Sequence, residues 1–554
     1  MAIDILTHEF VFSSTYKEKT SYLINLVTKY YKIMKRRDVI KGLAIIPVSG
    51  AVAGTFDSNL FKPVQKVKRK SVYEPLGVKT LINARGTVTV VGASKVLPEV
   101  RDAMDAAIDE YVQIDELMDG VGKRLGELMG TESGCVTSGA SAAITAGTAG
   151  CVTGGDPDKI WMIPNITGMK DEVVVPFYSR SAYDAGCKAV GVRMIEVADV
   201  AELKTALGPR TAMVYLLAGA GSESGALSLK IISDHTKPLG IPILIDAAAE
   251  GPENPNPHIV QGADLVAYSG GKYLNGPQCA GLLIGRKDLV MAARMNTGPH
   301  HGFGRGFKVG REEIIGMLTA VEMWFKRDHV GERKLWTARL EVIANRLKAI
   351  DGVITSIRQP SGRSNPSPAL SVSWDQSKIP YIGQDVEDLL WNGNPRISIG
   401  AAGSYFQPNQ KPSVSINSSQ LSDGEEKIVA DQIFAVLSKP VASARTTGAP
   451  AANLSGQWDV ETKYYAATVS QTFMIEQKGN DLKGTYIGHI GSRDLIGTIH
   501  ENDILIRSTY GVDGARVHSF FTGKIIGDTM QGHLSVGEYG EGTWTANRHV
   551  FKMS

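Results

Sequence analysis

Cysteine is scarce in this sequence, with four residues in 554: Cys135, Cys151, Cys187 and Cys279. No two of them form a CxxC pair, and no histidine stands at metal-ligand spacing from them, which argues against a zinc site. A disulfide framework would need many more cysteines in a chain of this size. Free cysteine is usually a small buried side chain, and we expect that role for all four.

An excess of charge of either sign is also missing. The 59 lysines and arginines nearly balance the 57 aspartates and glutamates, which gives a formal net charge of +2. Such a chain does not attract nucleic acid as a whole, and no long basic run follows residue 80. The hydrophobic content of 43% and the length of 554 residues instead predict a globular protein of two or three domains.

The N-terminal region has no apolar run long enough to span a bilayer, but one segment has the layout of an export signal. Residues 34–54, MKRRDVIKGLAIIPVSGAVAG, carry the twin arginine Arg36 and Arg37, a short apolar run and an Ala-x-Ala sequence. This layout resembles a twin-arginine signal, which exports folded proteins. We expect a periplasmic or exported protein, with residues 1–33 as an extension or Met34 as the true start. A basic segment of a cytoplasmic protein is the alternative.

Apolar strand-like runs alternate with helical patterns in residues 74–330. The runs AMVYLLAG, PILIDAAAE, DLVAYSGGK and AGLLIGRK are almost continuously apolar. Such strands, alternating with helices, are typical of a mostly parallel sheet that is buried on both faces. The sequence therefore predicts a large α/β domain.

The remainder of the chain contains two further domains and a linker. Residues 331–438 mix helical patterns with short strands and predict a smaller α/β domain. Residues 439–454, KPVASARTTGAPAANL, have the composition of a linker. From 455 to 552 the apolar pattern has a period of two, with a turn about every ten residues. This pattern predicts about eight antiparallel strands in a small closed barrel or sandwich.

One lysine stands in an unusual place. Lys272 follows the apolar strand DLVAY and a Ser-Gly-Gly turn, at the sheet edge where α/β proteins bind their ligands. Asp246 ends the apolar strand PILID 26 positions earlier, where a carboxylate is costly unless it meets a cation. An imine between the lysine and pyridoxal phosphate (PLP), with the aspartate at the ring nitrogen, explains both positions. Taken singly, a solvated lysine and a helix N-cap aspartate are the alternatives.

A turn rich in small residues supplies a candidate phosphate site between an apolar strand and a helix. Its residues are Ser138, Gly139, Ala140 and Ser141. Small side chains let backbone N–H groups and the positive end of the helix approach a phosphate. Ser269, just before the lysine, can add a hydroxyl group. A single turn of this kind is a weak signal. The order along the chain of this turn, a strand-end aspartate and a strand-end lysine is much more specific.

A resemblance to a known family rests on six stretches: LINARGTVTVVGAS, YVQIDELMDGVGKRLGEL, VTSGASAAITAGTAG, ILIDAAAE, DLVAYSGGKYLNGPQCAGLLIGRKDL and GRGFKVGREEIIGMLTAVE. Through them, residues 75–438 resemble the fold-type-I PLP-dependent enzymes, and within these the selenocysteine-synthase-like family of selenium transferases and ammonia-lyases. The resemblance implies PLP as cofactor, Lys272 as its attachment point, Asp246 at the pyridine nitrogen, and the 138–141 turn with Ser269 at the phosphate. It also implies a homodimer or larger oligomer.

Two regions depart from the family pattern. The RNA-handling N-terminal domain of the selenium transferases has no evident counterpart, and an export-like segment stands in its place. The barrel-like C-terminal domain is additional. Both departures argue against a tRNA substrate and favour a small-molecule amino substrate.

Candidates for substrate recognition are less specific. A planar arginine suits an amino-acid carboxylate, and Arg396 in NPRISIG and Arg85 in NARG are candidates. In the Gly-rich loop GPHHGFGRGFKVG, His300 and His301 are candidate proton donors or gate residues, and Arg305 and Lys308 can reach an anionic group, within the chain or across a subunit interface. The segment PFYSRSAYD offers residues that can stack on the cofactor ring: Tyr178, Ser179 and Arg180. Structural or merely solvated roles are the alternatives for all of these.

The leading functional hypothesis is a PLP-dependent lyase acting on an amino acid or amino sugar acid, in which Lys272 abstracts the α-proton and ammonia is released. Other PLP reactions on the same scaffold are the alternatives: racemisation, aldol cleavage, or selenium or sulfur transfer. A third hypothesis is a binding protein without catalysis, whose barrel aromatics either line a ligand pocket or form its core: Trp458, Phe473, Tyr486, Phe520 and Trp544.

Overall fold

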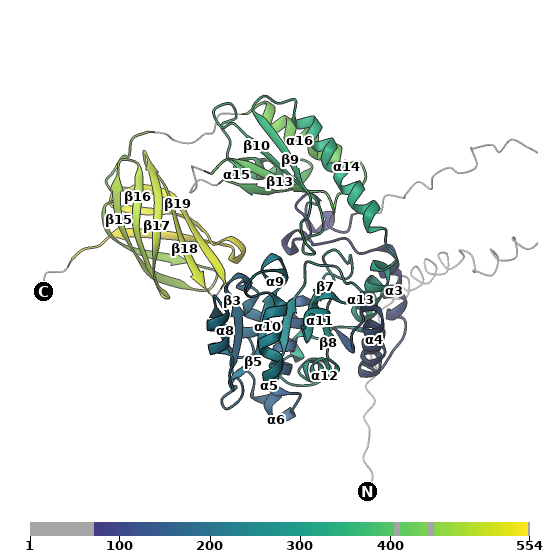
Figure 1. The fold of residues 1–554 in the computed structure, drawn as a ribbon. Helices are drawn as coiled ribbons and strands as arrows, with labels where there is room; N and C mark the ends of the chain where they lie inside the picture. The colour runs from purple at the N-terminus through teal and green to yellow at the C-terminus, as the bar shows by residue number, and fades with distance from the viewer. Residues whose placement is uncertain (1–70, 404–409, 441–447, 513, 552–554) are drawn as a thin grey trace, which may run out of the picture. The chain divides into compact units, whose positions relative to one another are not determined.

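The computed structural model describes residues 71–403, 410–440, 448–512 and 514–551. The export-like segment 34–54 and the extension before it lie outside these residues. No helix within the described ranges is long and apolar enough to cross a membrane. The buried apolar side chains form three separate clusters, one each in a large α/β part, a smaller α/β part and a barrel (Figure 1).

The large part is built around a seven-stranded sheet with the order β2-β8-β7-β6-β5-β3-β4. All strands run parallel except β8, which is antiparallel to both neighbours. The mostly parallel sheet predicted from the sequence is thereby confirmed. The strands are β2 (Ser133–Thr137), β3 (Glu172–Pro176), β4 (Arg193–Val197), β5 (Thr211–Leu217), β6 (Ile243–Asp246), β7 (Leu265–Ser269) and β8 (Gly281–Gly285).

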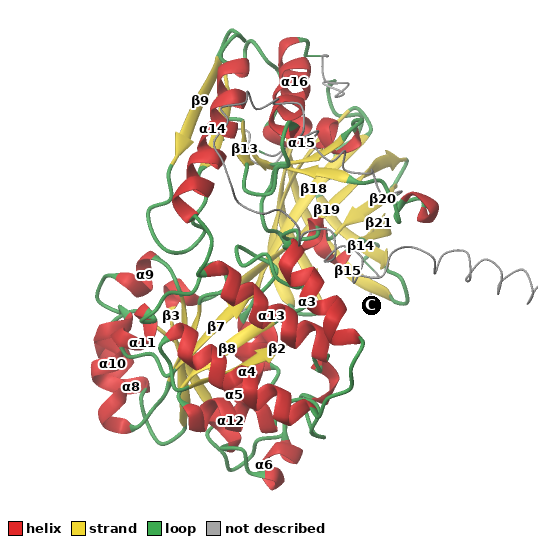
Figure 2. Cartoon of the chain, turned by 90° about the vertical axis from the view of Figure 1, so that its right-hand side faces the viewer, coloured by secondary structure: helices red, strands yellow, loops and turns green. Residues whose placement is uncertain are grey.

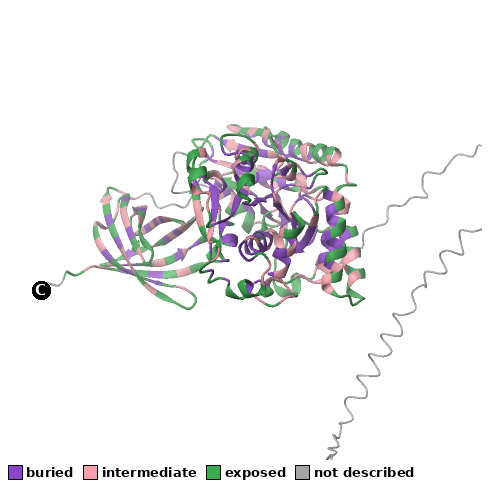
Figure 3. Cartoon of the chain, turned by 60° about the horizontal axis from the view of Figure 1, so that its bottom comes forward, coloured by how far each residue is buried: buried purple, intermediate pink, exposed green. Residues whose placement is uncertain are grey.

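Helices surround this sheet (Figure 2), as its continuously apolar strands require. The strands β5, β6 and β7 are buried along nearly their whole length (Figure 3). The helices are α3 (Pro98–Ile108), α4 (Ile114–Met129), α5 (Gly139–Thr153), α6 (Pro157–Met162), α7 (Asp184–Lys188), α8 (Val200–Ala206), α9 (Ala220–Glu223), α10 (Leu229–Thr236), α11 (Pro257–Gln261), α12 (Lys287–Met295) and α13 (Arg311–Trp324).

Helix α5 lies unusually close to the sheet because small residues line it. A Cβ on Gly147 would stand 2.4 Å from Cδ1 of Leu244 in β6, and one on Gly150 would stand 2.7 Å from the backbone N of Ala293 in α12. Any larger residue at these positions would push the helix away. The close packing therefore holds the first turn of α5 at the sheet edge where β2 ends.

The smaller part contains an antiparallel sheet in the order β12-β13-β10-β9 and a parallel pair, β1 with β11. Here the structure differs from the sequence-based boundaries, because Ile82 and Ala84 belong to the core of this part and not to the large domain. A strand this short carries no sequence signal for its distant partner. The elements are β1 (Leu81–Asn83), α14 (His329–Leu347), β9 (Val353–Arg358), β10 (Ala369–Trp374), α15 (Gly383–Asn392), β11 (Arg396–Ser398), β12 (Gly400–Ala402), β13 (Ser413–Asn417) and α16 (Glu425–Ser438).

The C-terminal part is a closed barrel of antiparallel strands, which confirms the expected all-β architecture. Each strand pairs with the next along the chain, and β21 closes the barrel against β14. The strands are β14 (Gly456–Lys463), β15 (Thr468–Lys478), β16 (Asp481–Gly488), β17 (Gly491–His500), β18 (Asp503–Val512), β19 (Ala515–Ile526), β20 (Thr529–Ser535) and β21 (Glu541–Arg548).

Aromatic side chains fill the barrel core. Four of the five considered as pocket lining are almost fully buried: Trp458, Phe473, Tyr486 and Trp544. The ring centroid of Phe473 lies 5.1 Å from that of Phe521 and 6.0 Å from that of Trp544, which is the spacing of a packed aromatic cluster. Phe521, rather than Phe520, completes this core, because successive residues of a strand point to opposite faces. The four buried aromatic residues therefore belong to the core of the barrel.

The cysteines are free thiols; Cys135 and Cys187 are buried, as expected, and Cys151 is half-buried. Burial raises the pKa of Cys135, Cys151 and Cys187 to about 12, so these thiols stay protonated. Cys279 is exposed, which corrects the expectation for that residue. It lies in the connection between β7 and β8, where the chain returns to the sheet from the lysine turn.

Candidate active site

The predicted cofactor-binding positions meet at one edge of the large sheet. The strands β2, β6 and β7 run in the same direction, so their carboxyl ends lie along a single edge. Asp246 ends β6, Ser269 ends β7, and Ser138 directly follows β2. Lys272 follows β7 by three residues. The strand β8 begins at this edge with Gly281, which pairs with Ser269 on one side and with β2 on the other.

Lys272 lies in a tight turn whose glycines leave no room for side chains. A Cβ on Gly270 would stand 2.7 Å from Sδ of Met317 and 2.8 Å from the backbone O of Pro277. The lysine is half-buried, and the loss of hydration lowers the pKa of its ammonium group, although the charge of Asp246 opposes this. A lowered pKa increases the share of neutral amine, which is the form that attacks an aldehyde.

Asp246 is 3% exposed. Its Oδ1 accepts a hydrogen bond from the backbone N–H of Ala248 at 2.9 Å, and its Oδ2 accepts one from the hydroxyl group of Tyr215 at 3.3 Å. Burial raises the pKa of this carboxyl group, against the opposing effects of the Ala248 N–H and the charge of Lys272. A carboxylate in these surroundings is stabilised by a buried cation such as a protonated pyridine nitrogen.

The phosphate turn is open on the side away from the sheet. Ser138 is the N-cap residue of α5, but its side chain caps none of the first N–H groups, which also lack partners within the helix. Gly139 has a φ of +83°, and a Cβ built on it would meet no atom within 4 Å. On the other side, a Cβ on Gly281 would stand 2.4 Å from the carbonyl carbon of Gly139. Ala140 and Ser141 continue the helix start.

These residues fit PLP. The half-buried amine suits its aldehyde, and the buried carboxylate suits its pyridine nitrogen. The uncapped helix N-terminus suits its phosphate. The open space over Gly139 leaves room for the phosphate. Ser269 is the last residue of β7 and pairs with Gly281, the first residue of β8. Its side chain therefore lies at the same edge of the sheet as the lysine turn.

The comparisons with known proteins agree with this cofactor. The family of Cys/Met metabolism PLP-dependent enzymes matches residues 111–303. The chain is 32% identical to D-glucosaminate-6-phosphate ammonia lyase of Salmonella typhimurium over 334 residues, which are 58% of this chain and 87% of that enzyme. The chain belongs to the selenocysteine-synthase-like family of PLP-dependent enzymes. The resemblance noted in the sequence is thereby confirmed, with PLP as cofactor.

Other relatives of this PLP-dependent enzyme carry out different reactions. It is 30% identical to 5'-C-glycyluridine monooxygenase-decarboxylase of a Streptomyces species, over 53% of this chain and 75% of that one. It is 25% identical to L-seryl-tRNA(Sec) selenium transferase of Serratia proteamaculans, over 47% and 59%. The solved structure of D-glucosaminate-6-phosphate ammonia-lyase matches 67% of this chain and 100% of its own with a TM-score of 0.58 at 28% identity. The family and the fold are therefore shared, while the reactions differ.

A buried carboxylate that sequence reasoning missed lies four residues after Asp246. Glu250 and His258 are 1% and 2% exposed, and Oε2 of Glu250 lies 2.7 Å from Nε2 of His258. Oε1 of Glu250 accepts a hydrogen bond from the hydroxyl group of Ser364, 114 residues away, at 2.9 Å. The carboxylate therefore joins the two α/β parts next to the site. The sequence ILIDAAAE shows the glutamate but gives no signal for these partners.

The segment that contains Ser364 makes two further contacts with the site. The backbone N–H of Asn365 donates to the carbonyl oxygen of Ala249 at 2.9 Å. The hydroxyl groups of Ser367 and Tyr273 lie 2.8 Å apart, and Tyr273 is the neighbour of the lysine. The smaller part thus fastens to both the aspartate loop and the lysine turn.

Arg363, in the same segment, is a further cation that sequence reasoning did not single out. Its guanidinium group lies 3.6 Å from Glu223, just after β5, and 3.3 Å from Glu253, in the loop after β6. It borders a cleft of about 560 Å³ that Trp324 and Trp336 also line. Arg363 is therefore a candidate for binding an anionic substrate group, alongside those predicted from the sequence.

The two arginines predicted to bind the substrate carboxylate have structural partners. Arg85 forms an ion pair of 3.1 Å with Glu387 in α15. Arg396 donates to the carbonyl oxygen of Trp391 at 3.0 Å and lies 4.8 Å from the centre of its indole ring. Both side chains are thus directed at α15, so each already has a partner within the chain.

The Gly-rich loop lies at the far end of α5. It is anchored there by Asn296, whose side-chain N–H donates to Thr153 at 2.9 Å. Since α5 has 15 residues, that end is about 20 Å from the phosphate turn. His301 and Arg305 are exposed on this loop, as is Lys308, whereas His300 lies 3.4 Å from Asp115. Within one chain these residues are remote from Lys272, so their predicted role depends on a second copy.

The candidates for ring stacking are held by other contacts. The hydroxyl group of Tyr178 donates to the carbonyl oxygen of Leu227 at 2.6 Å, and Ser179 accepts a hydrogen bond from the backbone N–H of Leu217. Arg180 forms an ion pair of 2.6 Å with Asp184. These contacts hold the segment after β3 at the sheet edge that also carries Asp246. They do not show which of the three residues would stack on the cofactor ring.

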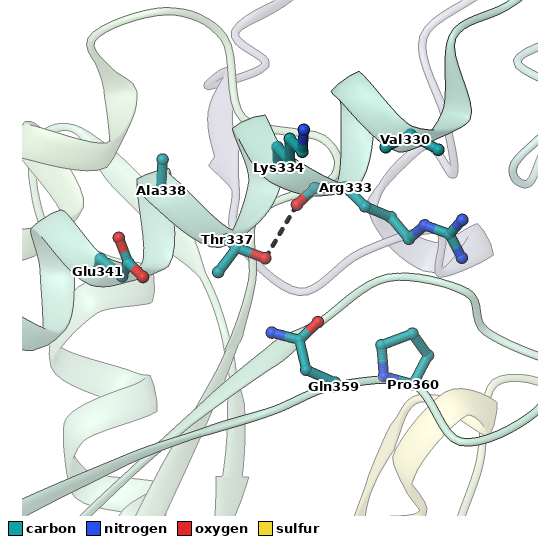
Figure 4. A pocket seen from close by; sticks show the side chains of 8 residues that line it. All are labelled: Val330, Arg333, Lys334, Thr337, Ala338, Glu341, Gln359 and Pro360. Carbon is teal, nitrogen blue, oxygen red and sulfur yellow. Dashed lines mark hydrogen bonds between the residues drawn. The ribbon is translucent and has the colours of Figure 1, made fainter.

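A separate groove of about 540 Å³ lies along the exposed side of α14 (Figure 4). It is lined by Arg333, Lys334 and Thr337, and Thr337 donates to the carbonyl oxygen of Arg333 at 2.9 Å. None of the residues suited to bind PLP lines this groove. The groove is therefore separate from the candidate cofactor site at the sheet edge.

Proposed function

We propose that this PLP-dependent enzyme is a lyase that releases ammonia from an amino acid or an amino sugar acid. One observation carries the proposal: Lys272 and Asp246 lie at neighbouring strand ends, in a chain that is 32% identical to an ammonia lyase over 87% of that enzyme. The substrate in the name of that relative, D-glucosaminate 6-phosphate, makes a 2-amino sugar acid the first substrate class to test.

Lys272 has two tasks in this reaction. Its Nζ would hold the cofactor covalently while no substrate is bound. The freed amine, kept in place by the close-packed Gly270 turn, then takes the proton from the carbon that bears the substrate amine. Its lowered pKa favours the neutral form that accepts this proton.

Asp246 would face the ring nitrogen of the cofactor and favour its protonated form, and the hydroxyl group of Tyr215 orients the carboxylate by donating to Oδ2. When bound, PLP supplies an electron-accepting ring that stabilises negative charge at the substrate carbon. The burial that raises the pKa of Asp246 also excludes water, so the ion pair with the ring is strong.

The net reaction balances without an oxidant. A 2-amino-3-hydroxy acid loses its α-proton and its 3-hydroxyl group, which leaves as water, and one water molecule then replaces the amine. The products are a 2-keto acid and ammonia. Phosphate or carboxylate groups of the substrate would meet Arg363, which lies at the carboxyl ends of β5 and β6.

An ammonia-release assay tests this proposal. The purified protein is incubated with PLP and with D-glucosaminate, its 6-phosphate, serine and threonine in turn, and ammonia and keto acid are measured together. We expect equal amounts of the two products with at least one substrate. Exchange of enantiomers, or an aldehyde product without ammonia, would support racemisation or aldol cleavage instead.

A second candidate is another PLP reaction on the same scaffold. The observation in its favour is that two further relatives are named as a monooxygenase-decarboxylase and a selenium transferase. Measurement of oxygen consumption and carbon dioxide release with the same substrates distinguishes the first of these from ammonia loss.

We further propose that the enzyme is a homodimer or larger, because His301 and Arg305 can serve an active site only from another subunit. Light scattering of the holoenzyme tests this, and a fully active monomer would contradict it. We also propose export by the segment 34–54, which rests on the twin arginine alone. Cell fractionation that finds only uncleaved cytoplasmic protein would refute it.

A further inference from the structure

The barrel interior has a polar end as well as an aromatic core. Inward-facing positions near the start of β17 and the end of β18 are polar, although they share a face with core residues such as Phe473 and Leu495. The residues at this end are Thr462, Gln471, Tyr486, Arg493, Ser508 and Tyr510. Barrels of eight strands often hold one small ligand at such a position.

Arg493 is the central group of this end. Its guanidinium carbon lies 4.5 Å from the ring centre of Tyr486 and 4.8 Å from that of Tyr510, so the cation is placed between two aromatic rings. Its Nε is buried and has no hydrogen-bond partner. Within the described residues the guanidinium group forms neither an ion pair nor a hydrogen bond. Aromatic rings offset only part of the cost of burying a cation.

The neighbouring tyrosine cannot serve as the missing anion. Burial raises the pKa of Tyr486 to about 12, even though the charge of Arg493 acts in the opposite direction. The phenol therefore stays protonated in neutral solution. The charge of Arg493 remains without a counter-charge from this ring.

A second polar atom at this end also lacks a partner. Ser508 is 1% exposed, and its Oγ makes no hydrogen bond. Its cross-strand neighbour on β17 is Leu495, so it stands diagonally to Arg493 at about 7 Å. By contrast, Thr462 donates to Gln471 at 2.9 Å. Two unsatisfied donors thus lie within the span of one small anion.

We propose that the polar end of the barrel binds the carboxylate group of a small organic acid, with Arg493 and Ser508 as donors. A guanidinium group fits a carboxylate through two parallel hydrogen bonds. A single inward cation matches one negative charge and not the double charge of a phosphate. The flat faces of Tyr486 and Tyr510 suit an apolar or planar body on the acid. This site is separate from the lyase reaction and gives the barrel a binding function of its own.

Calorimetry on the full-length holoenzyme tests the site with benzoate as the probe. Benzamide, which has the same shape without the charge, is the matched ligand control, and inorganic phosphate tests the preference for a carboxylate. We expect benzoate to bind with a Kd below about 1 mM, and benzamide and phosphate to bind at least about tenfold more weakly. Equal binding of benzoate and benzamide, or tighter binding of phosphate, would overturn the assignment.

Variants locate the binding within the chain. Arg493→Gln should weaken benzoate binding at least about tenfold, whereas Arg507→Gln, on the outward face of the next strand, should leave it unchanged. Ser508→Ala should weaken it by about threefold to tenfold and fold normally, which covers the case that Arg493→Gln does not fold. Benzoate binding that persists undiminished in Arg493→Gln or Ser508→Ala would place it elsewhere, for example in the active site, and would refute the proposal.

Discussion

The active-site edge and the polar end of the barrel both hold charge away from water, in different ways. At the sheet edge, burial shifts the pKa of Lys272 down and that of Asp246 up, so each moves towards its neutral form while the two charges partly offset this. In the barrel, the guanidinium group of Arg493 lies between the rings of Tyr486 and Tyr510 and meets no counter-charge from the described residues. The first arrangement suits a cofactor that carries complementary groups, and the second suits an anion from solution. Four changes test this contrast.

The largest effect is expected for Lys272→Ala. Loss of the covalent attachment and of the base should lower the rate of ammonia release about 10³-fold or more. Borohydride treatment of the variant with PLP should leave no cofactor on the protein. Lys334→Ala, an exposed lysine of α14, is the matched control and should keep full activity. A coloured, borohydride-reducible Lys272→Ala protein would show that another amine holds PLP.

Asp246→Asn should separate catalysis from stability. Without the carboxylate the ring nitrogen loses its partner, and activity should fall about 10²- to 10³-fold. The cofactor-free variant should be at least as stable as the wild type at pH 7. The folded-state pKa of Asp246 is raised, so its contribution to stability is present below the unfolded pKa and is lost as pH rises through the folded pKa.

Thermal unfolding of the two cofactor-free proteins from pH 4 to pH 8 checks this sign. The advantage of the asparagine variant should grow as pH rises. A wild-type protein that gains stability over the variant with rising pH would mean that Asp246 is paired with a cation before PLP binds.

The third change is Glu250→Ala. Glu250 differs from the active-site pair and from Arg493 because the fold already supplies its hydrogen-bond partners. Removal of this carboxylate leaves His258 without its hydrogen-bond partner and takes one of two acceptors from Ser364, and it should lower the free energy of unfolding by about 3 kcal/mol. Urea unfolding measures the loss. The exposed Glu253→Ala should cost less than about 1 kcal/mol. Equal losses in the two variants would remove the distinction between a satisfied buried group and a surface pair.

The smallest change is expected for Arg493→Met. Methionine keeps an unbranched apolar stem but removes the guanidinium cation, so the free energy of unfolding should change by less than about 1 kcal/mol, or rise. Ammonia release should be unaffected. A loss of more than about 2 kcal/mol would show that the cation between the two rings stabilises the barrel. The two sites would then no longer differ in whether their charges have partners in the folded chain.

Much of the fold and of the site could be predicted because its signals are local. The continuous apolar runs indicated the parallel sheet, and the period of two indicated the barrel. The positions of Lys272 and Asp246 at strand ends indicated the cofactor, since parallel strands bring their carboxyl ends to one edge. The small residues at the start of α5 indicated the phosphate turn, whereas the close packing of the helix against the sheet came from the structure.

Other features could not be predicted, because they depend on partners far away along the chain. Glu250 meets Ser364 across 114 residues, and β1 pairs with β11 in the core of the smaller part. The exposed position of Cys279 and the inward turn of Phe521 follow from register and loop path, which a single residue's identity does not fix.

By itself the sequence determined which residues are suited to hold PLP and which segments form strands, because periodicity and residue chemistry are written into neighbouring positions. Only the tertiary structure decided which charges find partners. It supplied His258 and Ser364 to Glu250, placed the loop of His301 at the far end of α5, and set Arg493 between two rings with no carboxylate of the described residues beside it. Coulomb interactions and hydrogen bonds depend on distance in space, and folding alone sets that distance.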